Sequence, residues 1–282
     1  MNDLTGGMAD ALEYIENNLT EDISVEDIAA RAFLSPFYFQ KIFHVLCGYT
    51  VGEYIRMRRL SCAAQELMSG DVKVIDTAMR YGYSSPDSFS KAFAAFHGIS
   101  PSAVKNGGES GTVIRSFAPL RIKISLEGGN MLEYSIKEKA SFTIVGYARK
   151  FSTDTSYAEI PQFWQEHFRS GRGKHIMGKF GACLDSDGKN FEYIIADNYM
   201  QQNDIPEGCV TRTIRGGLWA VFPCRGELPD SLQSVNTKIW SEWLQSLKGY
   251  ELDGDLDIEV YFPPAKDPQD NYSEIWIPVR KV

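Results

Sequence analysis

A glutamate between two aromatic residues near the end of the chain is the clearest candidate for ligand chemistry. In the run Tyr272–Val279 successive side chains of an extended strand lie on opposite faces, so Tyr272, Glu274 and Trp276 share one face. A carboxylate supplies charge and aromatic rings supply cation–π attraction, and together they bind cations. The pattern therefore predicts a cation site at Glu274. The alternative is a glutamate on the solvated face of an antiparallel strand, with its aromatic neighbours in the core.

Other reactive side chains are too scattered to build a metal site or an activated nucleophile. The five cysteines show no CxxC spacing and are odd in number, which is typical of reduced thiols: Cys47, Cys62, Cys183, Cys209 and Cys224. The four histidines form no H-x-x-x-H motif and no Cys/His cluster: His44, His97, His167 and His175. No Ser/His/Asp or Cys/His arrangement indicates nucleophilic catalysis. We therefore expect no metal, no cofactor and no catalytic residue.

Length and charge narrow the class of protein further. A chain of 282 residues suits two domains. Its net charge of −8 argues against coating DNA by bulk electrostatics, although a specific DNA binder needs only a basic docking face. No apolar run approaches the roughly 20 residues that span a bilayer, and the first residues lack the pattern of a signal peptide. We expect a cytoplasmic protein without a membrane partner.

The N-terminal third contains an internal repeat with an offset of fifty residues. The matching pairs are Ser35-Pro36 with Ser85-Pro86, Phe39 with Phe89, Lys41 with Lys91, Phe43 with Phe93 and Gly48 with Gly98. Each copy has the pattern of a helix, a tight turn and a second helix. A serine caps that second helix, proline takes its first position and glycine ends it. Matched apolar positions indicate a duplicated structural unit.

The spacing of the two copies suits double-stranded DNA. The segment between them, Val51 to Met68, would span about 27 Å as a helix. Successive major-groove faces of B-DNA lie about 34 Å apart. One chain could therefore place two recognition helices in adjacent grooves without dimerising. The alternative is a small helical bundle with no role in DNA binding.

Beyond a polar, glycine-rich stretch, Asn106–Gly111, the pattern changes to strands. Alternation predicts an edge strand at 121–126, a turn at Gly128-Gly129 and a strand at 131–136. Two βαββ units follow, with strands at 143–151, 179–184 and 191–196, then 217–224, 256–262 and 272–279. Their helices are expected at 160–169 and 232–247. The predicted fold is thus an all-α double helix-turn-helix (residues 1–107), a linker with an edge strand (108–130), and an α+β domain with an antiparallel sheet (131–282).

Residues 8–105 resemble the DNA-binding domain of AraC/XylS-type regulators. The resemblance rests on Val25 to Gly48, on E-Y-I-R-M-R-R-L (Glu53 to Leu60), on Ile75 to Phe93 and on G-I-S-P-S (Gly98 to Ser102). It implies that the exposed face of each second helix contacts bases. The candidates are Phe37, Gln40, Lys41 and His44 in the first copy, and Asp87, Ser88, Ser90 and Lys91 in the second. Glutamine suits adenine and lysine suits guanine or phosphate. Arg56 and Lys91 fit phosphate contacts better than base contacts.

Residues 131–282 resemble the GyrI-like effector-binding domain of multidrug-sensing regulators. The motifs are Glu138 to Gly146, Trp243 to Leu252, Ile258 to Pro263 and Glu274 to Val279. The resemblance implies that Glu274 lies in a ligand cleft and pairs with cationic aromatic drugs. It also implies aromatic walls, for which the candidates are Tyr147, Trp219, Tyr261 and Trp276. Glu192 occupies the position of Glu274 in the first βαββ unit, and the two approach each other if the units pack about a pseudo-dyad.

Together these features predict a transcription regulator that binds promoter DNA and senses a small, aromatic or cationic effector, with RNA polymerase as a further candidate partner. One alternative is a GyrI-like hydrolase of small electrophiles, in which Glu274 acts with Tyr147 or Tyr261. Another is a ligand-independent DNA binder whose second domain docks a protein. Activation, repression, the operator and the oligomeric state are left open by the sequence.

Overall fold

A computed structural model describes residues 4–107, 114–121, 132–200 and 204–282. The expected turn at Gly128-Gly129 and most of the expected edge strand at 121–126 lie outside these residues. Contacts divide the chain into two units. The first comprises Met1–Phe39 with Tyr49–Ser125, and the second comprises Gln40–Gly48 with Leu126–Val282.

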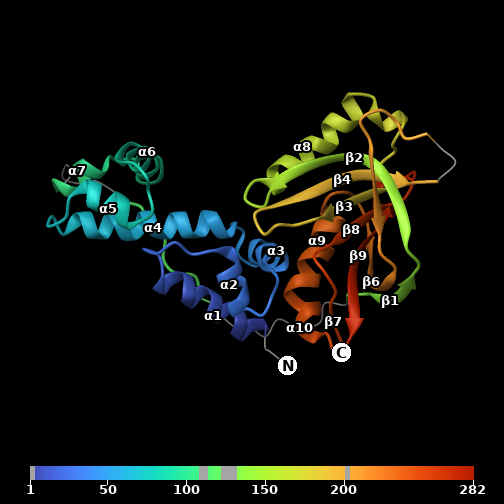
Figure 1. The fold of residues 1–282 in the computed structure, drawn as a ribbon, viewed down its shortest axis with the longest axis horizontal. Helices are drawn as coiled ribbons and strands as arrows, with labels where there is room; N and C mark the ends of the chain where they lie inside the picture. Colours follow the sequence, from blue (N-terminus) through green and yellow to red (C-terminus); the bar gives the residue numbers. More distant parts are fainter. Residues whose placement is uncertain (1–3, 108–113, 122–131, 201–203) are drawn as a thin grey trace. The chain divides into compact units, whose positions relative to one another are not determined.

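The N-terminal third is helical, as predicted (Figure 1). Its helices are α1 (Leu4–Asn17), α2 (Val25–Arg31), α3 (Pro36–Cys47), α4 (Val51–Met68), α5 (Val74–Arg80), α6 (Pro86–His97) and α7 (Pro101–Lys105). The predicted serine caps are present: the hydroxyl oxygen of Ser35 accepts from the amide of Tyr38 at 3.3 Å, and that of Ser85 accepts from the amide of Ser88 at 3.2 Å. Gly98 ends α6 with a φ of 78°, which glycine adopts without steric cost.

The helix α4 joins the two repeats and is held on both sides by buried groups. It begins with a capping box in which Thr50 and Glu53 satisfy each other's backbone amides. Its apolar side packs into a core with Phe89 and Phe93 of α6. On another side Arg58 forms an ion pair with Glu16 of α1 at 2.8 Å, and its guanidinium also donates to the carbonyl of Phe117. These contacts fix α4 within the first unit.

The second unit contains one antiparallel sheet. Its described strands are β1 (Ser135–Lys139), β2 (Phe142–Ser152), β3 (Phe180–Leu184), β4 (Asn190–Asn198), β5 (Val210–Ile214), β6 (Gly217–Arg225), β7 (Tyr250–Leu252), β8 (Asp257–Tyr261) and β9 (Tyr272–Lys281). Their order is β1-β6-β9-β8-β3-β4-β2-β5, and β7 pairs with β9. The predicted βαββ units are β2-α8-β3-β4, with α8 at Ser156–Arg169, and β6-α9-β8-β9, with α9 at Asp230–Lys238. Pairing of β3 with β8 joins the two units.

Both long helices of this unit cover the same face of the sheet, the helix face. Trp164 and Phe163 of α8 pack with Tyr193 and Ile195 of β4. After α9 the chain continues as a π-helical turn at Ile239–Trp243, which places the Trp243 ring 4.8 Å from that of Phe222 on β6. The opposite face, the inner face, carries its own apolar core, with Phe180, Trp219, Val221 and Ile258 among its members.

Candidate functional site

The strongest candidate site lies on the helix face of β8, and the sequence did not single it out. Side chains alternate along a strand, so Asp257, Glu259 and Tyr261 face the same way. Glu259 lies opposite Gly181 of β3 and Ile275 of β9. The central strand β8 thereby presents two carboxylates on the face that carries α8 and α9, and its neighbour β3 presents Gly181 and Cys183 opposite them.

Three aromatic residues surround the carboxylate of Glu259. The hydroxyls of Tyr261 and Tyr193 donate to its Oε2 atom at 2.8 Å and 3.1 Å. Trp164 of α8 donates from Nε1 to the Tyr193 hydroxyl at 2.9 Å, and its ring lies edge to face with that of Tyr261 at 5.3 Å. We call Trp164, Tyr193, Glu259 and Tyr261 the Glu259 cluster. Trp164, Glu259 and Tyr261 are half-buried, whereas Tyr193 is buried.

The electrostatics of the Glu259 cluster favour a positively charged ligand. Burial raises the pKa of Glu259, and the negative charge of Asp257 raises it further. Hydrogen bonds from Tyr261 and Tyr193 and the nearby ammonium of Lys41 act in the opposite direction. A carboxylate in this environment gains from a cation that compensates its charge.

Two glycines make the close packing of the Glu259 cluster possible. A Cβ atom on Gly181 would lie 2.1 Å from the Tyr193 hydroxyl oxygen and 3.0 Å from Oε2 of Glu259. A Cβ atom on Gly178, which has a φ of 83°, would lie 2.6 Å from the Trp164 ring. Any larger residue at Gly181 would therefore push Tyr193 away from the carboxylate.

The glutamate predicted from the sequence, Glu274, lies on the inner face and is already satisfied there. Tyr272 donates from its hydroxyl to Oε1 at 2.7 Å, and Trp276 donates from Nε1 to Oε2 at 2.6 Å. The three side chains therefore do share one face. The Lys139 ammonium lies 3.5 Å from the centre of the Trp276 ring, where a bound cation would lie. Glu274 itself is 8% exposed.

Of the remaining predicted ligand residues, Trp219 lies on the same face as Glu274, with its ring 6.3 Å from that of Trp276, whereas Glu192, Tyr147 and Tyr261 do not gather around Glu274. Trp219 is 1% exposed and belongs to the apolar core of the inner face. Glu192 forms a two-bonded ion pair with Arg212, and β8 and β3 lie between its strand and that of Glu274. The expected approach of Glu192 to Glu274 is therefore wrong, because the strand order separates them.

Tyr147 and Tyr261 lie on the helix face, away from Glu274. The ring of Tyr147 is covered by the Arg172 guanidinium at 4.7 Å, and His167 lies 5.8 Å away. Only Tyr261 joins the Glu259 cluster. The expectation that Tyr147, Trp219, Tyr261 and Trp276 line one cleft is thus wrong, because strand alternation divides them between two faces. Binding of a ligand by any of these residues stays a prediction.

The predicted base-contacting residues differ in exposure. In α3, Phe37 and Gln40 are 6% and 9% exposed, so the expected solvent-facing position is wrong for both. Within the second unit the Gln40 amide donates to the carbonyl of Gly188 at 2.6 Å, Lys41 forms an ion pair with Asp257, and His44 stacks on Tyr157 at 3.6 Å.

In the second copy of the repeat and in α4, the predicted residues are more accessible. Asp87, Ser88 and Lys91 of α6 are exposed, whereas Ser90 is half-buried, and Arg56 of α4 is exposed. The Ser88 hydroxyl donates to the carbonyl of Ser85 at 2.9 Å, so it is part of the helix cap. Contact of these residues with DNA stays a prediction.

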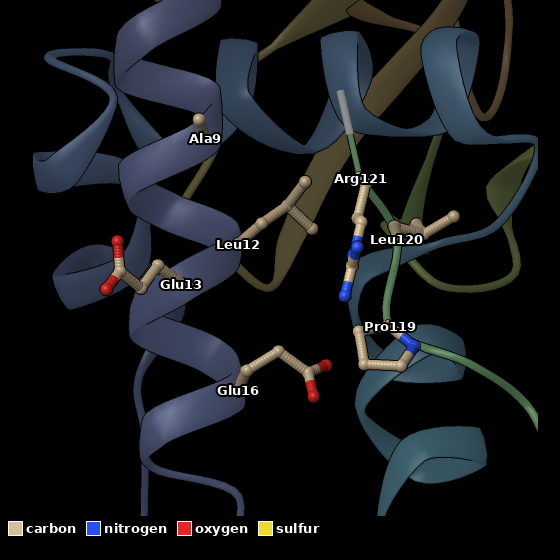
Figure 2. Close-up of a pocket in the computed structure, with 7 residues that line it drawn as sticks. All are labelled: Ala9, Leu12, Glu13, Glu16, Pro119, Leu120 and Arg121. Carbon is tan, nitrogen blue, oxygen red and sulfur yellow. The ribbon is translucent and has the colours of Figure 1, made fainter. Parts of the chain in front are cut away.

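A groove of about 380 Å³ lies in the first unit, between α1 and residues 119–121 (Figure 2). It is lined by Ala9, Leu12, Glu13, Glu16, Pro119, Leu120 and Arg121. Among the lining residues, Glu16 is held in place, because its carboxylate oxygens accept hydrogen bonds from Arg58 and from the Tyr54 hydroxyl.

Among the described residues no group of three His, Cys, Asp or Glu side chains is placed to hold a metal ion. No helix in that part of the chain is long and apolar enough to cross a membrane.

Comparison with known proteins shows that the helical N-terminal unit and the sheet unit together form a DNA-binding transcription regulator with a ligand-binding domain. A family model described as a helix-turn-helix domain matches residues 28–107, and one described as an integron-associated effector binding protein matches residues 135–279. The chain belongs to the AraC-type transcription regulators that carry a GyrI-like effector-binding domain.

Two regulators and one solved structure illustrate the similarity. The transcriptional regulator Rob of Salmonella typhimurium is 31% identical over 301 residues, which cover 99% of this chain and 100% of Rob. The transcriptional activator AarP of Providencia stuartii is 42% identical over 95 residues, 34% of this chain and 70% of AarP. The structure of SAV2435 bound to tetraphenylphosphonium covers 53% of this chain and 94% of its own, with 20% identity and a TM-score of 0.47.

Proposed function

We propose that a small aromatic cation binds at the Glu259 cluster and thereby changes the affinity of the chain for promoter DNA. The observation that carries the proposal is Glu259 itself, a half-buried carboxylate held by two tyrosine hydroxyls beside the Trp164 ring. Burial disfavours an isolated charge, so the carboxylate gains when a cation neutralises it. The aromatic rings of Trp164 and Tyr261 lie 5.3 Å apart in the same cluster, and aromatic rings can add cation–π attraction for such a ligand.

The regulatory step follows from linked equilibria. A ligand shifts a conformational equilibrium only by its difference in affinity for the two states. We propose that the cation prefers one state of the sheet unit and that this state has a different affinity for DNA. The protein acts in the cytoplasm as a regulator and not as an enzyme, and RNA polymerase is its further partner.

A hydrolase remains the second candidate because of one observation, the hydrogen bond of 2.8 Å between the Tyr261 hydroxyl and Glu259. A carboxylate beside a hydroxyl is an arrangement that general acid–base catalysis uses. Incubation with a small epoxide, followed by product analysis, tests the hydrolase hypothesis. If the parent hydrolyses the epoxide and Glu259→Gln does not, the Glu259 cluster is a catalytic site and not a sensor site.

The test of cation sensing uses tryptamine, which carries an ammonium on an aromatic ring, and tryptophol, which carries a neutral hydroxyl on the same ring. Tryptamine is protonated at neutral pH because alkyl amines have a pKa of about 10. We expect tryptamine, but not tryptophol, to raise the melting temperature of the intact chain. Equal shifts with both compounds would show that charge plays no part, and no shift with either would contradict binding.

The affinity for tryptamine is expected to depend on pH because the pKa of Glu259 is raised by burial and by Asp257. Below that raised pKa the free protein holds a proton on Glu259, and the cation must displace it. The Kd for tryptamine should therefore fall as the pH rises through this pKa and then become constant. Calorimetric titrations at a series of pH values measure the effect, and tryptophol is the control. A Kd that is independent of pH would contradict contact between the ammonium and Glu259.

Arg56 is expected to contact a phosphate, since it is exposed on α4. Substitution Arg56→Ala should weaken DNA binding about equally for all sequences and should reduce the slope of log K against log salt concentration by about 1. Fluorescence anisotropy with a specific and a scrambled duplex at several salt concentrations measures both. A loss confined to the specific duplex would instead identify Arg56 as a base contact.

A further inference from the structure

We propose that Asp257 holds the ammonium of Lys41 in the ligand-free chain, and that a cation bound at the Glu259 cluster releases it for contact with DNA. The effector then tightens DNA binding. This inference rests on the proposed function, because it assigns the direction in which the Glu259 cluster regulates the chain. It starts from a buried ammonium site that a predicted DNA-contacting lysine already fills.

The ammonium site lies within the second unit, which includes Gln40–Gly48 of α3 as well as the sheet. Lys41 forms an ion pair with Asp257 of β8, and its ammonium lies 5.6 Å from the centre of the Trp240 ring. The side chains of Lys41 and Asp257 are only 16% and 4% exposed. Asp257 and Trp240 therefore form a site for a primary ammonium, which we call the Lys41 site.

Lys41 stays charged in the Lys41 site. Burial acts to lower the pKa of Lys41, but attraction to Asp257 and the hydrogen bond with it act in the opposite direction, and the pKa lies above its ordinary value. Loss of one member of a buried ion pair is costly, because the other charge is left uncompensated. Asp257 therefore retains Lys41 as long as no other cation takes its place.

Two other predicted base contacts on α3 are also held within the second unit. The Gln40 amide donates to the carbonyl of Gly188 at 2.6 Å, and His44 stacks on Tyr157 at 3.6 Å. Base contacts are made by hydrogen bonds from exposed side chains to base edges. A lysine, a glutamine and a histidine that are engaged inside the protein cannot make those contacts at the same time.

The Lys41 site and the Glu259 cluster are neighbours on one strand. Asp257 and Glu259 are two residues apart on β8 and share a face, which places their Cα atoms about 7 Å apart. The ammonium of Lys41 already acts on Glu259, since it opposes the rise of the Glu259 pKa. A second cation at Glu259 lies within the range of this charge, and like charges in a poorly solvated site repel. Binding of the effector therefore favours release of Lys41.

Release of Lys41 increases the affinity for DNA, because the freed ammonium becomes available to a base or a phosphate. A ligand favours the state that it binds more tightly, which here is the state with Lys41 released. The linkage between two binding events is reciprocal. Removal of the Lys41 charge should therefore strengthen binding of the cation.

Asp257→Asn tests the hold on Lys41, because it removes the charge of the carboxylate and leaves Lys41 intact for DNA. Fluorescence anisotropy of the intact chain with a duplex selected from a random library measures the Kd. Without ligand, the variant should bind this duplex at least about fivefold more tightly than the parent. Saturating tryptamine should tighten the parent at least about fivefold and the variant less than about twofold. The control Glu274→Gln, the same change on the inner face, should behave as the parent.

Lys41→Met gives a second readout, which does not depend on DNA. Isothermal titration with tryptamine should give a Kd at least about fivefold lower for this variant than for the parent, since the competing charge is gone. The matched control is Lys91→Met in the second copy of the repeat, where the lysine is exposed. It should keep the Kd of the parent for tryptamine. Melting curves without ligand establish that each variant folds.

The outcomes separate this inference from the proposed function. If tryptamine changes the Kd of the parent for DNA, but Asp257→Asn without ligand binds DNA no more tightly than the parent, cation sensing stands and the hold on Lys41 is wrong. If tryptamine weakens DNA binding by the parent, sensing also stands and release of Lys41 is wrong. Equal affinities of Lys41→Met and the parent for tryptamine would contradict the competition. If tryptamine does not bind the parent, the proposed function fails, and release of Lys41 by a cation fails with it.

Discussion

Replacing Glu259 with glutamine is expected to abolish the stabilisation of the chain by tryptamine. A ligand present at 100 times its Kd adds about 2.7 kcal/mol to the free energy of unfolding. For a domain of roughly 150–250 residues, each kcal/mol raises the melting temperature by about 2–4 °C. The glutamine keeps the shape of the side chain and removes the charge that holds the ammonium. A thermal-shift titration of parent and variant measures the difference.

The matched control is the same substitution on the other face of the sheet, Glu274→Gln. Its carboxylate is satisfied by Tyr272 and Trp276, and Lys139 lies over the Trp276 ring. This variant should therefore keep its response to tryptamine. A response lost in Glu274→Gln and kept in Glu259→Gln would place the ligand on the inner face, as the sequence pattern alone suggested.

Substitution of Arg58 by alanine is expected to destabilise the first unit by about 3–5 kcal/mol, the cost of leaving one member of a buried ion pair alone. Arg58 is 8% exposed and binds both oxygens of Glu16, at 2.8 Å to 3.1 Å. It also donates to the carbonyl of Phe117. The variant would leave the carboxylate of Glu16 and this carbonyl without their donor. Urea unfolding followed by circular dichroism measures the loss.

Two variants complete the Arg58 experiment. Arg56→Ala, two residues away on the exposed side of α4, should change stability by no more than about 0.5 kcal/mol. The double variant Glu16→Gln with Arg58→Met should recover part of the loss, since it removes both charges together. An unfolding midpoint for Arg58→Ala equal to that of the parent would show that the ion pair contributes nothing to the unit.

The helices of the first unit were predictable because their signals are local. A serine followed by proline marks the start of α6, and Gly98 marks its end, and both lie within a few residues of the groups they satisfy. The role of Arg58 was not predictable in the same way. Its partners, Glu16 and Phe117, are far away in sequence, and only the packed structure brings them to one guanidinium.

The sheet was predictable where strands are long and alternate. Both βαββ units lie close to their expected ranges. The short strands β5 (Val210–Ile214) and β7 (Tyr250–Leu252) were missed, because strands of 3–5 residues gain stability mainly from the neighbours with which they pair. The expected strand at 131–136 is replaced by β1 at Ser135–Lys139, whose register is set by β6.

The location of the candidate site could not be predicted from the sequence, because the sequence does not tell which face of the sheet the helices cover. Alternation correctly placed Tyr272, Glu274 and Trp276 on one face, but it cannot tell which face two helices will cover. The run Ile258 to Pro263 contains the same spacing of glutamate and aromatic residue, at Glu259 and Tyr261, and this was the available signal. The contact of Lys139 with Trp276 joins residues far apart in the chain, so no local pattern could reveal it.

The most direct test of the account is the affinity of the intact chain for DNA with and without bound cation. A duplex selected from a random library serves as the probe, and fluorescence anisotropy at one salt concentration gives its Kd. Coupling free energies between linked sites are about 1–3 kcal/mol, so saturating tryptamine should change the Kd of the parent about 5- to 150-fold. The same addition should leave Glu259→Gln within twofold. A parent that binds tryptamine in the thermal-shift titration yet keeps the same Kd for DNA would contradict the account.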